Sequence, residues 1–412
     1  MTNRLRMLAL GPQDVFPPVD GGKEGIYGAL SALARRADVT YAFPATPATS
    51  LAGYERIGVT PAPLDVAPQE SAATILGATL RLKPYKFEKY GSARMLAALD
   101  RALGAGGFDA IVCHHAHMFR LAGKLQRLRG WRLPTIVREH NLEYGIVESF
   151  RDSMRGGRRV AADLFATLTR REEHAIWRQA DAVAFLSDSD LEVAQRSGVA
   201  GRFILAREGV PLPPRRPIAR ASANAPLLVL LNPRAAQSVA NLHDFVDAFW
   251  KPLRARGRLA DDVLHVTGVT TEQLATLVAT DARELAQLGI SGLGFLPSLE
   301  ETLQGALALV SPTFIGGGIR KKVLEAMAHQ LPVIATEMDM RTCSYFERGV
   351  NILPMDTPDM FADIVGRLRA DEAHWRDISA RARDTVEEFA NWDRYGGVMF
   401  DIASELVRAR AT

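Results

Sequence analysis

The chain contains 412 residues, of which 47% are hydrophobic and 24% charged, and its formal net charge is +3. This length allows two domains with substantial cores, no segment is apolar over the length that spans a bilayer, and the charge is too small to indicate nucleic-acid binding by itself. The two cysteines, Cys113 and Cys343, provide neither a disulfide framework nor a thiolate metal cluster; they fit a reducing compartment, and we expect both in the core.

The first half alternates short apolar runs with longer amphipathic segments. The N-terminal run "MLAL" is broken at once by "GPQDVFPP", so we expect no signal peptide and a cytoplasmic chain. Runs rich in valine, isoleucine and leucine between amphipathic helices are typical of the parallel strands of an α/β fold. We predict strands at Arg6–Leu10, Asp38–Ala42, Asp109–Cys113, Thr135–Arg138, Ala182–Leu186 and Arg202–Ala206. The predicted helices include Glu24–Arg35 and Asp163–Arg178.

A proline-rich, basic segment without periodicity, "GVPLPPRRPIARASANAP", interrupts this alternation and is predicted to be a linker. After it the pattern restarts at "LLVLL" and ends in a helical tail. We therefore predict two doubly wound Rossmann-like domains. The first covers residues 1–212 and is joined by a crossing helix at 392–412, and the second covers 213–391. Ligands bind outside the carboxyl ends of the strands in such sheets, so chemistry is expected in a cleft between the domains.

The stretch "FIGGGIRKKVLEAMAHQLPVIAT" follows a predicted strand and leads into a helix. Three glycines precede that helix, namely Gly316, Gly317 and Gly318. Free N–H groups at a helix N-terminus bind anions, and residues without Cβ let a diphosphate approach the backbone. Arg320 and Lys322 add positive charge, whereas Glu325 is better placed to accept hydrogen bonds from sugar hydroxyls. The stretch predicts a nucleoside diphosphate site; a tight turn before a solvated helix is the alternative. It matches neither the dinucleotide fingerprint nor the P-loop.

The same stretch resembles the signature of GT-B glycosyltransferases of the family 4 group: a glycine-rich loop, Arg-x-Lys, Glu-Ala-x-Ala and Pro-Val. "PPVDGGKEGIYGALSALARRADVTYAF" resembles the N-terminal glycine loop and first helix of that family, and "EHNLEY" a His-Asn-x-Glu element of one subgroup. The resemblance covers nearly the whole chain. It implies the GT-B fold, in which two Rossmann-like domains face each other across a cleft.

By this resemblance, Arg320 and Lys322 hold the diphosphate of a nucleoside diphosphate sugar, and Glu325 binds the ribose. The glycines Gly316, Gly317 and Gly318 admit the phosphate and the donor sugar, while Gly21 and Gly22 face the diphosphate from the first domain. Many relatives carry a glutamate where this chain has Gly317, so the sugar is not predicted. Retention at the anomeric carbon without a metal is also implied. In "LLNPRAAQSVANL", Arg234 either adds charge for the phosphates or lies at the surface.

Histidines cluster after one strand, in "IVCHHAHMF". His115 and His117 share one face if the strand continues, but a third metal ligand at a convincing spacing is missing, so no metal is predicted. A loop histidine satisfied by its neighbours is the alternative. The resemblance favours His117, which matches the second histidine of a His-x-His element near the reacting centre. There it would bond the donor sugar or an acceptor hydroxyl, with His115 as the second choice.

Two further polar strand ends are candidates. In "REHNLEY", Glu143 or His140 would hold the acceptor hydroxyl, or Asn141 would simply cap the following helix. In "SDSD", Asp188 and Asp190 form an Asp-x-Asp pair that resembles a metal-binding motif. A helix N-cap at Asp188 or Ser189 explains the motif better.

Two stretches of the first half are locally basic. "RLKPYKFEKYGSAR" interleaves lysines with the aromatic residues Tyr85, Phe87 and Tyr90. "RDSMRGGRRVAADLFATLTRR" carries Arg155, Arg158, Arg159, Arg170 and Arg171. A solvated helix face is the simplest interpretation, and stacking on single-stranded nucleic acid is another. A third hypothesis is peripheral contact with the anionic inner face of the cytoplasmic membrane, with the three aromatic side chains entering it.

These features predict an enzyme of the hexosyltransferase type. It would move a sugar from a nucleoside diphosphate sugar to a glycan or lipid-linked glycan acceptor, in bacterial surface polysaccharide biosynthesis. His117, Arg320 and Lys322 are the predicted catalytic residues, because charge builds on the diphosphate as the glycosidic bond breaks. No cofactor, metal or nucleic acid is expected. A sugar-nucleotide epimerase or hydrolase of the same architecture and a non-catalytic nucleotide-sugar-binding protein are the alternatives.

Overall fold

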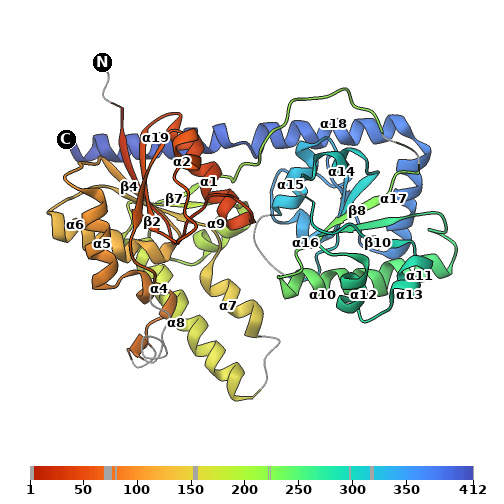
Figure 1. The fold of residues 1–412 in the computed structure, drawn as a ribbon, viewed down its shortest axis with the longest axis horizontal. Helices are drawn as coiled ribbons and strands as arrows, with labels where there is room; N and C mark the ends of the chain where they lie inside the picture. The colour runs from red at the N-terminus through yellow and green to blue at the C-terminus, as the bar shows by residue number, and fades with distance from the viewer. Residues whose placement is uncertain are drawn as a thin grey trace. The chain divides into compact units, whose positions relative to one another are not determined.

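The computed structural model describes residues 4–68, 77–78, 81–151, 156–220, 222, 224–296, 298–315 and 320–411. The chain forms two compact units (Figure 1). Unit 1 comprises Met1–Gly209 and Trp392–Thr412, and unit 2 comprises Val210–Asn391.

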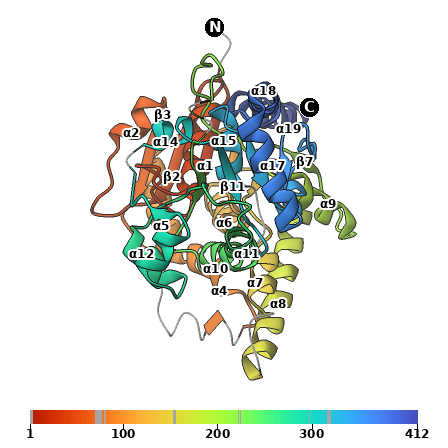
Figure 2. The same ribbon diagram turned by 90° about the vertical axis from the view of Figure 1, so that its right-hand side faces the viewer.

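Unit 1 is built on a seven-stranded parallel sheet in the order β3-β2-β1-β4-β5-β6-β7. The strands are β1 (Arg6–Leu10), β2 (Asp38–Pro44), β3 (Val59–Leu64), β4 (Ala110–His114), β5 (Thr135–Glu139), β6 (Ala182–Phe185) and β7 (Phe203–Leu205). The helices are α1 (Gly21–Ala34), α2 (Ala52–Arg56), α4 (Tyr85–Tyr90), α5 (Ala93–Leu103), the 3₁₀ turn η1 (Ala116–Met118), α6 (Phe119–Arg129), α7 (Glu143–Arg151), α8 (Gly157–Gln179), α9 (Asp188–Arg196) and α19 (Trp392–Ala411). Helices α7 and α8 lie side by side as a hairpin (Figure 1 and Figure 2).

Unit 2 contains a six-stranded parallel sheet in the order β10-β9-β8-β11-β12-β13. Its strands are β8 (Leu227–Leu230), β9 (Leu264–Thr267), β10 (Ile290–Gly292), β11 (Ala308–Ser311), β12 (Val333–Ala335) and β13 (Leu353–Pro354). Its helices are α10 (Ala236–Phe245), which continues through a π turn (Val246–Trp250) into α11 (Lys251–Ala255), then α12 (Thr271–Leu277), α13 (Ala282–Gln287), α14 (Glu300–Gln304), α15 (Lys321–Ala328), α16 (Glu337–Met340), α17 (Pro358–Ala370) and α18 (Glu372–Phe389). The predicted α/β class with two doubly wound sheets is confirmed.

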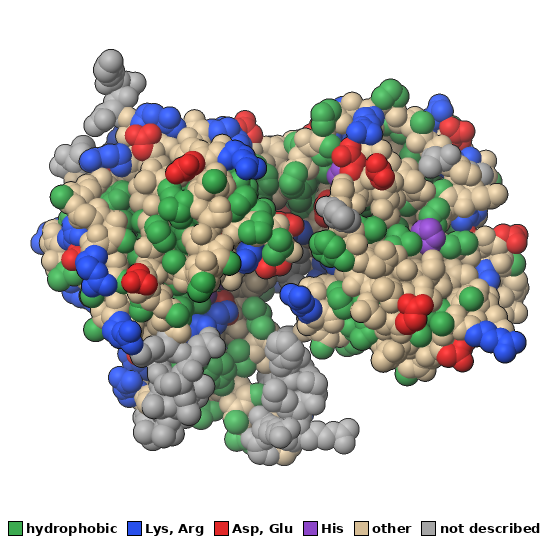
Figure 3. All heavy atoms as spheres, viewed as in Figure 1, with side chains coloured by type: hydrophobic (Ala, Val, Ile, Leu, Met, Phe, Trp, Pro, Cys, Tyr) green, Lys and Arg blue, Asp and Glu red, His purple; other side chains and the backbone are tan. Residues whose placement is uncertain are grey.

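Both cores follow from the apolar runs. The strands β1, β4 and β6 in unit 1 and β8 in unit 2 are almost wholly buried, as expected for parallel strands covered on both faces. Cys113 and Cys343 are buried, as predicted. On the face drawn in Figure 3, Lys and Arg side chains alternate with Asp and Glu over each unit, in line with the small net charge. No helix in the described ranges is long and apolar enough to cross a membrane.

The C-terminal helix α19 packs on α1 within unit 1. Two glycines allow this close approach. A Cβ at Gly28 would lie 2.2 Å from the Trp392 ring, and a Cβ at Gly396 would lie 2.8 Å from the Ala32 carbonyl oxygen. Residues 392–411 therefore return the chain to the first unit.

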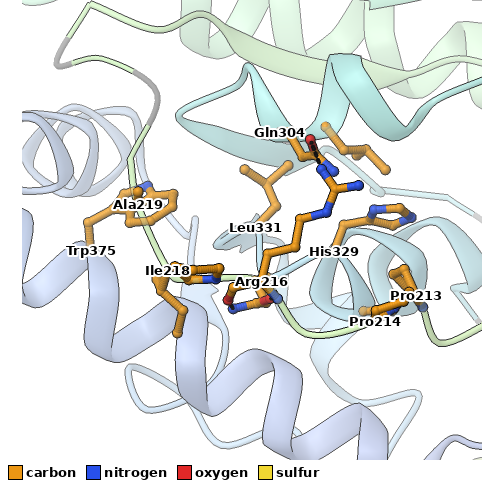
Figure 4. A pocket seen from close by; sticks show the side chains of 13 residues that line it. Pro213, Pro214, Arg216, Ile218, Ala219, Gln304, His329, Leu331 and Trp375 are labelled. Carbon is orange, nitrogen blue, oxygen red and sulfur yellow. Dashed lines mark hydrogen bonds between the residues drawn. The ribbon is translucent and has the colours of Figure 1, made fainter.

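The predicted linker is held against unit 2. The Val210 amide donates to the Ala390 carbonyl at 3.0 Å, and Arg215 pairs with Asp384 at 2.5 Å. Arg216 donates to Gln304 at 2.9 Å, at a pocket of about 150 Å³ that also contains Trp375 (Figure 4). The segment is thus a strap along unit 2 and not a free connection.

Candidate functional site

The helix α15 begins beside the carboxyl edge of the unit 2 sheet, as the sequence predicted. The ammonium group of Lys322 donates a hydrogen bond to the carbonyl of Leu230, the last residue of β8. Burial lowers the pKa of Lys322 to about 8, although the nearby Glu325 acts in the opposite direction. Glu325 is half-buried one turn later in the helix. Lys322 therefore lies at the predicted edge of the sheet, and Glu325 is near enough to affect its pKa.

Arg320, the residue before α15, forms an ion pair with Asp339 of α16. Its Nε lies 2.6 Å from Asp339 Oδ1, and Asp339 is fully buried. Burial raises the pKa of Asp339, and this effect is opposed by Arg320 and by the hydroxyl groups of Ser311 and Thr313. The carboxylate fixes one edge of the guanidinium, so we assign Asp339 as a positioning residue that sequence reasoning missed.

A second missed residue, Asn241, holds the segment that leads to the glycines. Its Oδ1 accepts hydrogen bonds from the amides of Phe314 and Ile315, both at 2.9 Å, and its Nδ2 donates to the Ile315 carbonyl at 2.9 Å. Asn241 is 92% buried on α10, between apolar residues of the core. Such an amide needs hydrogen-bond partners, and a lone asparagine on the apolar face of a helix is the feature by which this residue could have been found.

The remaining donor-site predictions in unit 2 are less defined. Gly316, Gly317 and Gly318 lie outside the described residues. Arg234 is exposed on the loop after β8, where its amide donates to Asn232 Oδ1 at 3.2 Å. Its position fits either interpretation that the sequence left open.

Residues 228–371, which contain Arg320, Lys322, Glu325, Asn241 and Asp339, match the family model described as "Glycosyl transferases group 1". This match lies wholly within unit 2. The prediction of a glycosyltransferase is supported by this match, whereas the hexosyltransferase type and the family 4 subgroup stay predictions.

Solved structures with the same fold cover both units of this chain. Sucrose-phosphate synthase from Thermosynechococcus elongatus superposes with a TM-score of 0.70 at 17% identity, covering 98% of this chain and 100% of the other. The HepE protein of Anabaena, solved with UDP-glucose, gives 0.62 at 12% identity and 99% coverage of both chains. The lipopolysaccharide outer core galactosyltransferase WaaB gives 0.55 at 16% identity, covering 98% of this chain and 100% of its own. The GT-B fold is thereby confirmed. No curated protein matches the chain in sequence.

In unit 1, Gly21 and Gly22 are the first residues of α1. Asp20 caps the helix by accepting from the Lys23 amide at 3.0 Å. A Cβ at Gly22 would meet only the Asp20 carboxylate at 3.4 Å. There is thus space beside position 22, and the backbone at this helix N-terminus is open to the approach of a ligand.

Four aromatic rings form a stacked column at the carboxyl ends of β4 and β5. The ring centroids are 4.7 Å apart between Tyr90 and His117, 4.9 Å between His117 and His115, and 3.9 Å between His115 and His140. The structure therefore brings together the three histidines that the sequence placed on two different strands.

Glu143 joins this column from the first turn of α7. Its Oε1 lies 3.7 Å from His115 Nδ1 and 3.9 Å from His117 Nδ1, and both its oxygens accept from Lys86, at 2.7 and 2.6 Å. The buried carboxylate of Glu173 accepts from the amides of Glu143 and Tyr144 at 2.8 and 2.9 Å. Glu173 thus binds the amide groups of the first turn, and it fixes the place of Glu143.

The structure contradicts two of the alternatives for the first basic stretch and the predicted helix cap in "SDSD". Phe87 and Tyr90 are buried in the unit 1 core, because α4 packs its apolar face inward, so neither enters a membrane or stacks on a nucleic acid. Ser187, not Asp188 or Ser189, caps α9 by accepting from the Asp190 amide at 3.1 Å. Asp188 instead pairs with Arg207 at 2.7 Å. In the second basic stretch, Arg155 lies outside the described residues.

The lowered pKa of Lys322 predicts a pH dependence of donor binding. Without ligand, Lys322 loses its charge as the pH rises through about 8, so the KM for the donor should rise above that pH. The effect on kcat should be smaller, because a bound diphosphate favours the protonated amine. Arginine stays charged throughout, so Lys322→Arg should remove the alkaline rise. A wild-type KM that stays flat to pH 9.5 in steady-state assays would contradict this role.

Proposed function

We propose that the protein transfers a sugar from a nucleoside diphosphate sugar to a hydroxyl group of a glycan or lipid-linked glycan. The glycosidic C–O bond to the diphosphate breaks, a new C–O bond forms to the acceptor oxygen, and the hydroxyl proton leaves with the diphosphate or to solvent. The observation that carries the proposal is that Arg320, Lys322 and Glu325 lie within the segment matching group 1 glycosyltransferases.

Each residue has a distinct role in this proposal. The guanidinium of Arg320 and the ammonium of Lys322 stabilise the charge that develops on the leaving diphosphate, where fixed charges need no reorganisation. Glu325 accepts hydrogen bonds from the ribose, and Gly316 to Gly318 admit the phosphate. By this proposal no metal ion is needed at the diphosphate, because Arg320 and Lys322 supply two positive charges. Retention, a cytoplasmic location and a role in surface polysaccharide synthesis belong to the same proposal, by resemblance.

Unit 1 is proposed to bind the acceptor. His115, His117, His140 and Glu143 gather hydrogen-bonding groups at the carboxyl ends of β4 and β5, where ligands of parallel sheets bind. Gly21 and Gly22 are assigned to the donor phosphates by resemblance. Both parts of unit 1 are open to test once a donor is known.

The first experiment is a thermal-shift screen with UDP, GDP, ADP and CMP, since a ligand of the native state raises its melting temperature. UDP is the first choice, because the HepE structure holds UDP-glucose. We expect one nucleoside diphosphate to stabilise the wild type and to stabilise Glu325→Ala much less. No shift with any of the four would reject the donor site as assigned. Turnover of the donor without an acceptor would instead favour a hydrolase or epimerase.

A further inference from the structure

The helix hairpin α7–α8 extends from unit 1 beyond the carboxyl edge of its sheet (Figure 1 and Figure 2). Helix α7 starts shortly after β5, and Glu173 of α8 binds its first amides, so residues 157–172 of α8 run away from the sheet. At 1.5 Å per residue, this part of α8 is about 24 Å long. It packs mainly on α7.

The outer face of α8 carries aliphatic side chains in adjacent turns. Val160 and Leu164 lie one turn apart on the same face, 69% and 52% exposed, and the neighbouring Phe165 is 39% exposed. The other side of the helix is packed, since Ala166 and Thr169 are buried. Large apolar side chains that gather in contact with water mark an interaction surface, whereas isolated ones need no explanation.

The segment that carries this apolar face is strongly basic. Residues 151–171 contain six arginines and two aspartates, so their net charge of +4 exceeds that of the whole chain, +3. Arg170 is engaged within the hairpin, because its guanidinium pairs with Glu148 and lies 4.8 Å from the centre of the Tyr144 ring. Arg159 and Arg171 are exposed and form no ion pair within the described ranges. These two cations are therefore available to an anionic partner.

We propose that the outer face of the α7–α8 hairpin binds the anionic surface of a lipid bilayer. Val160 and Leu164 enter the boundary between headgroups and acyl chains, and Arg159 and Arg171 pair with phosphate groups. Apolar side chains flanked by arginines are the pattern by which helices bind membrane interfaces. Aliphatic side chains do not stack on bases, so a bilayer fits this face better than a nucleic acid.

This surface is distinct from the membrane contact expected from the aromatic residues of the first basic stretch. It does not rest on the proposed sugar transfer. If both proposals hold, the hairpin keeps the carboxyl edge of the unit 1 sheet near a lipid-linked acceptor.

Co-sedimentation of the full-length protein with vesicles of equimolar phosphatidylglycerol and phosphatidylcholine tests the proposal, with pure phosphatidylcholine vesicles as the uncharged reference. We expect binding to the anionic vesicles only, and weaker binding at high salt, which screens exposed charges. An arginine near such a surface contributes about fivefold to the partition coefficient, so Arg159→Gln/Arg171→Gln should lower it about 25-fold. Val160→Ser/Leu164→Ser should lower it about tenfold. All four side chains are exposed, so the melting temperature should not change.

Leu128 is the matched control, because it is 56% exposed between Arg127 and Arg129 at the end of α6, which leads to the opposite edge of the sheet. Leu128→Ser should bind the vesicles like the wild type. An environment-sensitive dye on Val160→Cys should shift its emission to the blue with anionic vesicles, and the same dye on Leu128→Cys should not. Both native cysteines are buried, so the dye marks the introduced one.

The proposal is overturned if the wild type does not bind anionic vesicles at low salt. It is also overturned if Val160→Ser/Leu164→Ser binds them as tightly as the wild type, because the arginines alone then bind polyanions. A dimer in light scattering that the same variant abolishes would show that a second copy covers the face. The vesicle assay contains neither donor nor acceptor, so its outcome is independent of nucleotide binding by unit 2.

Discussion

Arg320→Ala is expected to lower the rate of sugar transfer by about 10²–10³-fold, the usual effect of removing one group that stabilises developing charge. The guanidinium is held by Asp339 at 2.6 Å, so its orientation is set before the donor binds. Lysine restores the charge but not the planar fork that suits phosphate, so Arg320→Lys should recover only part of the rate. The measurement is nucleoside diphosphate release from the donor found in the binding screen, with and without acceptor glycans.

The alanine variant also leaves the carboxylate of Asp339 buried without its ion-pair partner, which destabilises a fold. The double variant Arg320→Ala/Asp339→Asn separates the two effects. It should regain most of the thermal stability while transfer stays slow. If the double variant regains activity together with stability, Arg320 is a structural residue. If Arg320→Ala alone works within threefold of wild type, the assignment to the diphosphate is wrong.

The fold was predictable because parallel strands buried on both faces leave a strong hydrophobic pattern. The strand β3 was missed, since its sequence "VTPAPL" contains Pro61 and Pro63. Proline has no backbone N–H to donate to a neighbouring strand. Both prolines are tolerated because β3 lies at the edge of the sheet, and positions two residues apart direct their backbone N to the same side, where no strand pairs with β3. The low strand propensity of proline therefore argued against β3, although its position at the sheet edge allows it.

The site residues were predictable only where the residues that act together are also close in sequence. Lys322 and Glu325 follow from their place in one helix. Asp339 and Asn241 do not, because their partners are distant in sequence and only the folded sheet brings them together. The same holds for Glu143, whose place beside His115 and His117 depends on two neighbouring strands and not on spacing along the chain.

Arg383→Ala is expected to destabilise unit 2 by about 3 kcal/mol or more, because buried carbonyls lose their donor. The Arg383 side chain is 4% exposed. It donates to the carbonyl of Ala328, the last residue of α15, to the Pro213 carbonyl of the strap at 2.7 Å, and to Glu387 at 2.6 Å. It therefore joins the donor-site helix, the strap and α18.

Arg381→Ala is the matched control on the same helix. Arg381 pairs with Asp377 one turn earlier at 2.9 Å but is 52% exposed, so its loss should cost within about 0.5 kcal/mol. Urea denaturation gives the two free energies, and hydrogen exchange should show faster opening of residues 321–328 and 372–389 only in Arg383→Ala. Because the variant keeps Arg320, Lys322 and Glu325, it should still bind the nucleotide at low temperature, unlike Arg320→Ala. If the two variants lose the same free energy of unfolding, the buried Arg383–Glu387 ion pair and the anchoring of α15 by Arg383 contribute nothing to the stability of unit 2.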